Sequence, residues 1–193
     1  MHVIVGLGNP GNRYTATRHN VGVLVVAELA RRWRLSLTPT PYGSRLAHGR
    51  INGEPVLIVE PQMYMNLSGQ ALAQLQPAVN VAELIVVHDD LDLACARLRI
   101  KRGGGSGGHR GVESIVERYG PQFVRVRLGV GRPPAGEDAA EYVLSPFAHT
   151  ESARIEAAVI RAADAVECVR QYGVEMAMNQ FNTRSNSATP SMA

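Results

Sequence analysis

Short apolar runs alternate with longer amphipathic stretches along this chain. The runs at His2–Val5, Val56–Val59 and Leu84–His88 predict three buried strands, each bounded by turn-forming or polar residues. Apolar residues recur at helical spacing within Asn20–Arg34 and again within Ile155–Val169, which predicts two amphipathic helices. Strands that alternate with helices are typical of an α/β domain.

Other segments carry weaker signals of secondary structure. Arg45–Ile51 is a possible edge strand inside a polar, turn-rich region, and a helix is expected near Val112–Tyr119. Ser68 is expected to cap a further helix that runs through Leu72 and Leu75.

Basic and apolar residues alternate in two segments, residues 97–101 and 125–128. Because a strand has a side-chain period of two, one face of each segment is expected to join the core while the bases stand together on the other. The residues expected in the core are Leu98, Ile100, Val126 and Leu128. A glycine-rich run, residues 103–111, lies between the two segments.

Positive charge is concentrated in this part of the chain. The 36 positions from Arg97 to Arg132 hold nine basic and two acidic residues, a net charge of +7, and the remaining residues carry −4. A positive stretch on an otherwise acidic body favours a polyanion as the partner.

Composition narrows the class of protein. The 193 residues fit one globular domain, which we expect to span residues 1–182, with 183–193 as a flexible C-terminal tail. No apolar run approaches the roughly 18 residues that cross a bilayer, and the N-terminus lacks the features of a signal peptide. Cys95 and Cys168 form neither a metal-ligand spacing nor a disulfide framework, so a cytoplasmic location is expected.

The turn after the first strand, Gly6–Gly11, matches the G-x-G-x-x-G pattern of dinucleotide-binding proteins. That use requires a helix to begin inside the motif and an acid to end the next strand, and Pro10 and the helical window that follows disfavour both. A structural turn explains the glycines. It does not explain Asn9 at the mouth of the strand, so Asn9 is a candidate functional residue.

His19 and the acids that end the third strand are candidates for acid–base chemistry. His19 lies on the same strand-to-helix connection as Asn9, where a capping or packing role is the alternative. The segment His88–Asp92 could bind a metal ion, but it completes no zinc or calcium spacing. A single carboxylate that orients a histidine, Asp89 or Asp90, is the more economical interpretation.

Two loops could contact a substrate. The run Gly103–Gly111 lacks the G-K-[S/T] ending of a P-loop, so it is either a flexible linker or a loop that approaches phosphate. Its position between two basic strands favours phosphate. In Met63–Gly69, an amide lies between the methionines and a helix cap, which suits a site that needs a neutral donor and acceptor beside apolar contact. Simple packing of the methionines explains the segment equally well.

Together, seven segments resemble bacterial peptidyl-tRNA hydrolases. In family order they are GLGNPGNRY, TRHNVG, MYMNLSG, VVHDDLDL, KRGGGSGGHRG, RVRLGVGRP and YVLSPF. The resemblance implies a single α/β domain with a twisted mixed β-sheet flanked by helices, in which the glycine loop and residues 148–172 border the cleft. It implies a monomer that hydrolyses the ester between a peptide and the 3′ ribose of tRNA, with no cofactor or metal ion.

The resemblance also implies roles for individual residues. His19 matches the catalytic base, and Asp89 matches the carboxylate that orients it. The other matching positions are Asn9, Met65 and Asn66 at the peptide and ester, Tyr14 at the terminal adenosine, His109 as a site histidine, and Lys101 with Arg127 at the 5′ phosphate. Amide N–H donors can meet the charge that develops on the ester carbonyl.

Arg110 departs from the family, which usually has an asparagine there that is associated with substrate binding. Its charge points to contact with RNA phosphate instead. Two other function classes fit parts of the sequence. A non-catalytic RNA-binding protein on this scaffold need not keep His19, Asp89 and Asn66 together, and a nucleoside or small-ester hydrolase would leave the basic stretch without a role.

Overall fold

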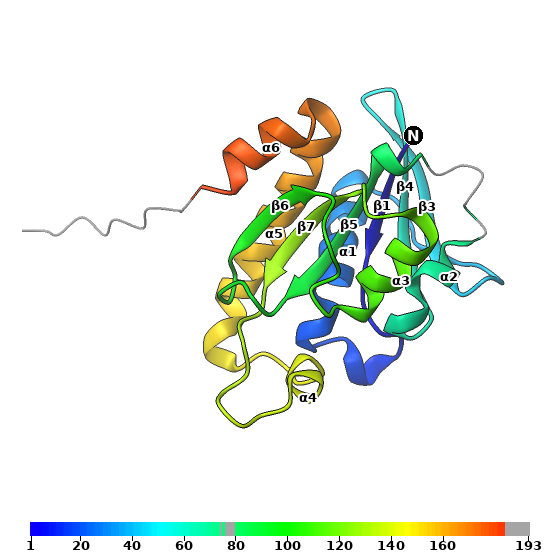
Figure 1. The fold of residues 1–193 in the computed structure, drawn as a ribbon. Coiled ribbons are helices and arrows are strands. Elements are labelled where there is room, and N and C mark those ends of the chain that lie inside the picture. Colours follow the sequence, from blue (N-terminus) through cyan, green and yellow to red (C-terminus); the bar gives the residue numbers. More distant parts are fainter. Residues whose placement is uncertain (74, 76–79, 184–193) are drawn as a thin grey trace, which may run out of the picture.

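The strands form one sheet of seven in the computed structural model, which describes residues 1–73, 75 and 80–183 (Figure 1). The strand order is β2-β3-β4-β1-β5-β7-β6. Pairs β4–β1, β1–β5 and β5–β7 are parallel and the outer pairs are antiparallel, so the predicted mixed sheet is confirmed. The strands are β1 (His2–Gly6), β2 (Thr38–Pro39), β3 (Ser44–Ile51), β4 (Glu54–Pro61), β5 (Leu84–Asp90), β6 (Leu98–Arg102) and β7 (Val124–Gly129).

Helices cover both faces of this sheet (Figure 1). The α-helices are α1 (Val21–Trp33), α2 (Ser68–Ala71), α3 (Arg110–Tyr119), α4 (Ala139–Val143), α5 (His149–Tyr172) and α6 (Val174–Phe181). Ile4 of β1 packs into the core beside α1, α5 and α6, whereas Val3 and Val5 pack on the other face beside α2 and α3. Both faces are covered, which explains why the central strands read as continuous apolar runs. No helix in the described part of the chain is long and apolar enough to cross a membrane.

Two sequence predictions are wrong in detail. β3 is not an edge strand, because β2 lies on its outer side and pairs with Leu46 and Arg45 of β3. β2 has only two residues, which are too few to give a recognisable sequence pattern. Ser68 does not cap a helix. It is the first residue of α2, its hydroxyl donates to the carbonyl of Met65 at 2.7 Å, and α2 ends at Ala71. A 3₁₀ turn, Met65–Leu67, leads directly into α2, so the Ser68 hydroxyl donates back to the carbonyl of this turn and not forward to a backbone N–H of α2. The predicted tail, apart from residue 183, lies outside the described residues.

The alternating strands behave as predicted on their core face. Leu98, Ile100, Val126 and Leu128 are all buried. On the opposite face, antiparallel pairing places Lys101 beside Arg125 and Arg99 beside Arg127. The bases are therefore gathered on one surface of β6 and β7, with one exception, since the side chain of Arg125 is itself buried.

Candidate active site

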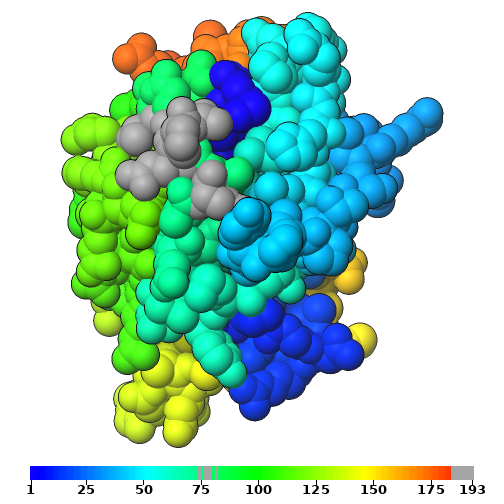
Figure 2. All heavy atoms as spheres, turned by 90° about the vertical axis from the view of Figure 1, so that its right-hand side faces the viewer, coloured from blue at the N-terminus to red at the C-terminus, as the bar shows by residue number. Residues whose placement is uncertain are grey.

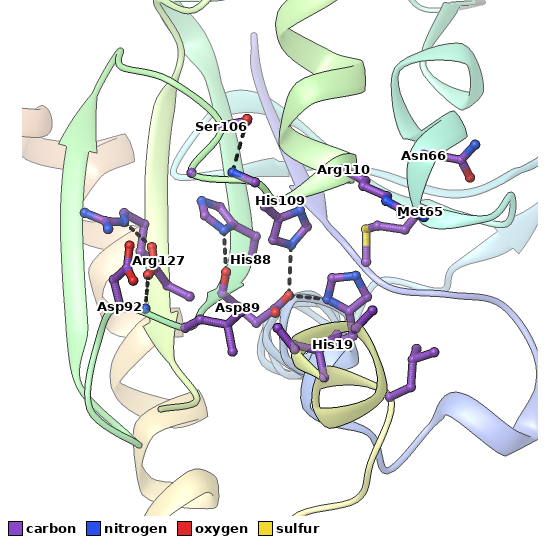
Figure 3. A pocket seen from close by; sticks show the side chains of 18 of the residues that line it. His19, Met65, Asn66, His88, Asp89, Asp92, Ser106, His109, Arg110 and Arg127 are labelled. Carbon is purple, nitrogen blue, oxygen red and sulfur yellow. Dashed lines mark hydrogen bonds and ion pairs between the residues drawn. The ribbon is translucent and has the colours of Figure 1, made fainter. Parts of the chain in front are cut away.

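A cleft of about 700 Å³ opens at the edge of the sheet where the parallel strands β1, β5 and β7 end (Figure 3). Ligand sites of α/β proteins lie at this edge because the connecting loops of neighbouring strands meet there. All the predicted site residues line this cleft, namely Asn9, Tyr14, His19, Met65, Asn66, Asp89, Lys101, His109, Arg110 and Arg127.

The border of the cleft differs in part from expectation. Gly105–Gly108 line it, as expected for the glycine loop. The opposite border, in the described part of the chain, is formed by residues between Asp138 and Leu144, around α4, and not by the expected 148–172 region. The space-filling view shows the α4 segment, in yellow, at the same end of the molecule as the N-terminal turns, in dark blue (Figure 2).

His19 reaches the cleft from a 3₁₀ turn, Arg18–Asn20, between β1 and α1. Gly22 lets the first turn of α1 approach the sheet, since a Cβ there would lie 2.4 Å from the carbonyl oxygen of Val87. Asn20 fixes the preceding loop. Its Oδ1 accepts from the backbone N–H of Asn9 at 2.9 Å and its Nδ2 donates to the carbonyl of Asn9 at 3.0 Å. Sequence reasoning missed Asn20, although it belongs to the TRHNVG segment.

Asp89 joins two histidines. Its Oδ1 lies 2.8 Å from Nδ1 of His19 and 2.9 Å from Nε2 of His109. The carboxylate is only 3% exposed. Burial alone would raise the pKa of Asp89, but His109 and His19 outweigh it and hold this pKa well below its usual range. Asp89 is therefore a buried anion aimed at the ring of His19.

The hydrogen bonds of His109 select one tautomer of its ring. Its Nδ1 accepts from the backbone N–H groups of Gly111 and Val112, at 3.2 and 3.3 Å, and so caps α3. A nitrogen that accepts carries no proton, so Nε2 bears the hydrogen that His109 donates to Asp89. With both nitrogens committed, His109 orients Asp89 and cannot take a proton from water without losing the cap.

His88 is a third histidine, and it is buried in the wall of the cleft. Its Nδ1 donates to the carbonyl of Asp89 at 2.7 Å, and its ring meets His109 edge-on at 4.9 Å between centroids. Burial, with the neighbouring His109, lowers the pKa of His88 to about 3. His88 is therefore neutral and packs as a structural ring beside the site.

Three of these groups could also be considered as metal ligands. His19, Asp89 and His109 each offer one ligand atom, and these atoms lie within 4.8 Å of one another. This set differs from the segment His88–Asp92 that the sequence suggested. A metal ion would have to replace the protons of both N–H···O bonds, because one nitrogen cannot hold a proton and a metal ion through the same lone pair. The observed distances are those of hydrogen bonds.

The neighbouring acids are occupied elsewhere. Asp90 Oδ2 lies 2.6 Å from Nε of Arg127, and Asp92 pairs with Arg132. The sequence left open whether Asp89 or Asp90 orients the histidine, and the structure selects Asp89.

The amides of Asn9 and Asn66 both line the cleft. Oδ1 of Asn9 accepts from the backbone N–H of Met65 at 2.9 Å, which fixes the orientation of the Asn9 amide. Among the described residues, no acceptor takes the protons of its Nδ2, so these can serve a substrate. Asn66 is exposed on the following 3₁₀ turn, Met65–Leu67. The ring of Tyr14, which also lines the cleft, has the guanidinium of Arg13 4.5 Å from its centroid.

Bases form the far wall of the cleft. Burial and the nearby Arg127 and Arg125 lower the pKa of Lys101, and no ion pair involves Lys101 among the described residues. Arg110 is exposed at the start of α3 and lies near Met65 and Asn66 in the close-up view (Figure 3). These cations are suited to bind phosphate.

Arg18, which sequence reasoning also missed, ties the turn that carries His19 to the cleft border. Its guanidinium forms a bidentate pair with Glu151 of α5, at 3.0 and 2.6 Å, and lies over the rings of Tyr142 and Phe147. Its backbone N–H donates to the carbonyl of Ser145 at 3.1 Å. One buried arginine next to His19 therefore holds both α5 and the segment that follows α4.

Comparisons with known proteins agree with this arrangement. The family described as peptidyl-tRNA hydrolase matches residues 3–189. A peptidyl-tRNA hydrolase of Chloroflexus aggregans is 47% identical over 186 residues, covering 94% of this chain and 99% of the relative. One of Anaeromyxobacter dehalogenans is 44% identical over 191 residues, covering 97% of this chain and 100% of the relative.

Solved structures give the same result. A crystal structure of peptidyl-tRNA hydrolase from Acinetobacter baumannii superimposes with a TM-score of 0.89 at 36% identity, covering 95% of each chain. A purine nucleoside phosphorylase from Toxoplasma gondii, 9% identical, covers 89% of this chain and 92% of its own with a TM-score of 0.51, which shows a related fold alone. By sequence and by fold, this chain belongs to the peptidyl-tRNA hydrolase family.

Proposed function

We propose that the protein hydrolyses the ester between a peptide, or an N-blocked aminoacyl group, and the 3′ ribose of tRNA, with His19 as the general base. The activity follows from membership of the family. The assignment of the base rests on the 2.8 Å hydrogen bond between His19 Nδ1 and Asp89 Oδ1. Because Nδ1 is committed to Asp89, Nε2 is the ring nitrogen that can take a proton from water.

The reaction then needs only side chains of this cleft. His19 removes a proton from water while the water oxygen bonds to the ester carbonyl carbon, and Asp89 stabilises the imidazolium that forms. Negative charge moves to the carbonyl oxygen, where the N–H donors of Asn9 and Asn66 can meet it. The bond to the ribose 3′ oxygen breaks, this oxygen takes the proton back from His19, and free tRNA is released for translation.

The basic residues of the cleft wall bind the RNA through its phosphates. Lys101 and Arg127 bind the 5′ phosphate of the tRNA, Arg110 contacts an RNA phosphate nearer the ester, and Tyr14 packs near the terminal adenosine. Met65 supplies apolar contact beside the ester. Contacts to phosphate carry no base sequence, so this mode of binding suits tRNA of any amino acid and weakens as salt rises.

The other function classes account for less of the cleft. A non-catalytic RNA-binding protein has no need of the hydrogen-bonded His19–Asp89 pair in the cleft that Asn66 also lines. A small-ester hydrolase has no need of the basic wall. Peptidyl-tRNA arises where ribosomes work, so we place the enzyme in the cytosol. All residues that the mechanism uses come from one chain, which is consistent with a monomer.

Cleavage of N-acetyl-aminoacyl-tRNA, followed by release of free tRNA, tests the proposal. We expect His19→Ala to lower kcat by at least about 100-fold and to keep tRNA binding, since general base catalysis supplies a factor of that order. His48→Ala, at an exposed histidine of β3 outside the cleft, is the control and should retain full activity. We expect no change on addition of a chelator. Rapid cleavage by His19→Ala would reject the assignment of the base.

A further inference from the structure

Arg125 is the one base of the β6–β7 surface whose side chain is buried, with an exposed fraction of 1%. It forms no ion pair with a carboxylate in the described part of the chain. Instead, its guanidinium donates to two backbone carbonyls, those of Gly104 and Gly105, and lies 4.7 Å from the ring centroid of Phe123. Burying a cation without a counter-ion costs desolvation free energy, which suggests that the Arg125 side chain has a role at this site.

These two hydrogen bonds determine which way the glycine loop, residues 103–108, faces. The chain has no cis peptide bonds, and a trans peptide group holds its C=O and N–H on opposite sides. The carbonyls of Gly104 and Gly105 point toward Arg125, so the N–H groups of Gly105 and Ser106 point away from it. Neither N–H has an acceptor among the residues that the structure describes. Gly105 and Ser106 both line the cleft.

The same loop conformation controls the position of Lys101. Gly104 has a φ of 96°, which side chains rarely adopt, and a Cβ there would lie 2.7 Å from Nζ of Lys101. Lys101 lies directly opposite Arg125 in the antiparallel register of β6 and β7. The positions of the Lys101 ammonium group and of the two free N–H groups therefore depend on the same backbone turn, and Arg125 holds this turn through its hydrogen bonds to the two carbonyls.

We propose that Arg125 is a positioning residue that holds the glycine loop in a phosphate-binding conformation, in which the N–H groups of Gly105 and Ser106 act with Lys101 on one phosphate of the RNA. Backbone amides in a glycine-rich turn form concave anion sites of this kind. The phosphate is the 5′-terminal one, because Lys101 is part of the site. The inference rests on the proposed function, since it assumes tRNA as the substrate.

The test compares N-acetyl-aminoacyl-tRNA with and without its 5′ phosphate. For each enzyme, the ratio of kcat/KM on the two substrates measures recognition of that phosphate. We expect Arg125→Gln to lower this ratio about tenfold, the effect of losing one charge-assisted hydrogen bond, and to change the rate on the dephosphorylated substrate little. Arg125→Lys keeps the charge but cannot bridge two carbonyls as a guanidinium does, so it should restore the ratio only in part.

Arg102→Gln is the matched control. Arg102 lies on β6, the strand next to β7, and like Arg125 it donates through its guanidinium to two backbone carbonyls, those of Ala82 and Gln122. Unlike Arg125, it is exposed and lies outside the cleft. This variant should keep the wild-type ratio. An unchanged ratio in Arg125→Gln, or equal losses on both substrates, would overturn the inference. A wild-type enzyme that cleaves both substrates equally would overturn it as well, together with the 5′-phosphate role of Lys101, while leaving the hydrolase activity intact.

Gly104→Ala provides a second variant that leaves Arg125 in place and decides the question if Arg125→Gln does not fold. The added Cβ strains the backbone and displaces the ammonium group of Lys101. We expect it to lower the same ratio by about tenfold at an unchanged rate on dephosphorylated substrate. If Gly104→Ala folds and keeps the wild-type ratio, the loop makes no contact with the 5′ phosphate.

Discussion

His19 and His109 donate to the same oxygen of Asp89, at 2.8 and 2.9 Å, with their ring centroids 4.9 Å apart. Either ring could be considered as the base from this contact alone. The second ring nitrogens distinguish the two histidines. Nδ1 of His109 accepts hydrogen bonds from the backbone N–H groups at the start of α3. His19 binds Asp89 through Nδ1, so its Nε2 is available to a substrate or water. One histidine can therefore move a proton, and the other orients the carboxylate.

This division predicts different behaviour of the two histidines on substitution. His109→Ala should lower the free energy of unfolding by about 1 kcal/mol through loss of the helix cap, and His109→Asn should recover most of that, because asparagine caps helices well. Both variants should lose less turnover than the roughly 100-fold or greater loss expected for His19→Ala. Urea denaturation and single-turnover cleavage measure the two effects. Complete inactivity of His109→Asn in a folded protein would assign proton transfer to His109 as well.

The amide of Asn9 allows a substitution that is nearly neutral for structure. Its Oδ1 accepts from the N–H of Met65, so Asn9→Asp keeps this acceptor and the side-chain size but removes both N–H donors. We expect kcat to fall by about 100- to 1,000-fold, as on removal of an oxyanion donor, at a nearly unchanged melting temperature. Asn12→Asp, in the exposed part of the same turn, serves as the control. A normal kcat for Asn9→Asp would remove Asn9 from the oxyanion site.

The sequence predicted the features that depend on local periodicity. Apolar runs gave the central strands, and the ends of parallel strands gave the edge where Asn9, His19 and Asp89 meet. Alternation placed Lys101 and Arg127 on one surface. Alternation could not predict that Arg125 is buried while the neighbouring basic residues are not, because its burial depends on how the glycine loop folds over β7.

The residues that sequence reasoning missed have partners far along the chain. Arg18 pairs with Glu151, 133 positions away, and no periodicity reports such a contact. Asn20 holds Asn9 through two hydrogen bonds that depend on the shape of one turn. Pairing also settled the choice of carboxylate, since Asp90 is bound to Arg127, and a sequence of adjacent acids does not show which one is already paired.

The Arg18–Glu151 pair predicts how stability depends on pH. Hydrogen bonds from Arg18 lower the pKa of Glu151 from its usual 4.5 to about 2. A carboxylate with a lowered pKa in the folded state stabilises the protein fully above the unfolded pKa, and this contribution is lost as pH falls toward about 2. We expect a loss of about 2 kcal/mol across that range, reduced by the water that still reaches Glu151.

Glu151→Gln should remove this part of the pH dependence, because glutamine does not titrate. Denaturant unfolding between about pH 5 and about pH 2 measures it, since the window lies between the unfolded and folded pKa values. Glu156→Gln, at an exposed position of α5, should retain the wild-type slope. Parallel curves for wild type and Glu151→Gln would show that the ion pair with Arg18 contributes no net stability.

Substitution of Arg110 tests whether the positive charge at this position contacts an RNA phosphate. Arg110 is exposed at the first turn of α3, lines the cleft, and forms no ion pair within the described residues, so its charge is available to an RNA phosphate. We expect Arg110→Ala to reduce the slope of log K against log salt for tRNA binding by about one, the effect of losing one phosphate contact. Arg50→Ala, at an exposed arginine of β3 outside the cleft, should leave the slope unchanged. Arg110→Asn should reduce the slope as alanine does but keep turnover, because an amide removes the charge and can still hydrogen-bond the substrate. If the slope stays at its wild-type value in both variants, Arg110 contacts no phosphate and its charge acts on another part of the substrate.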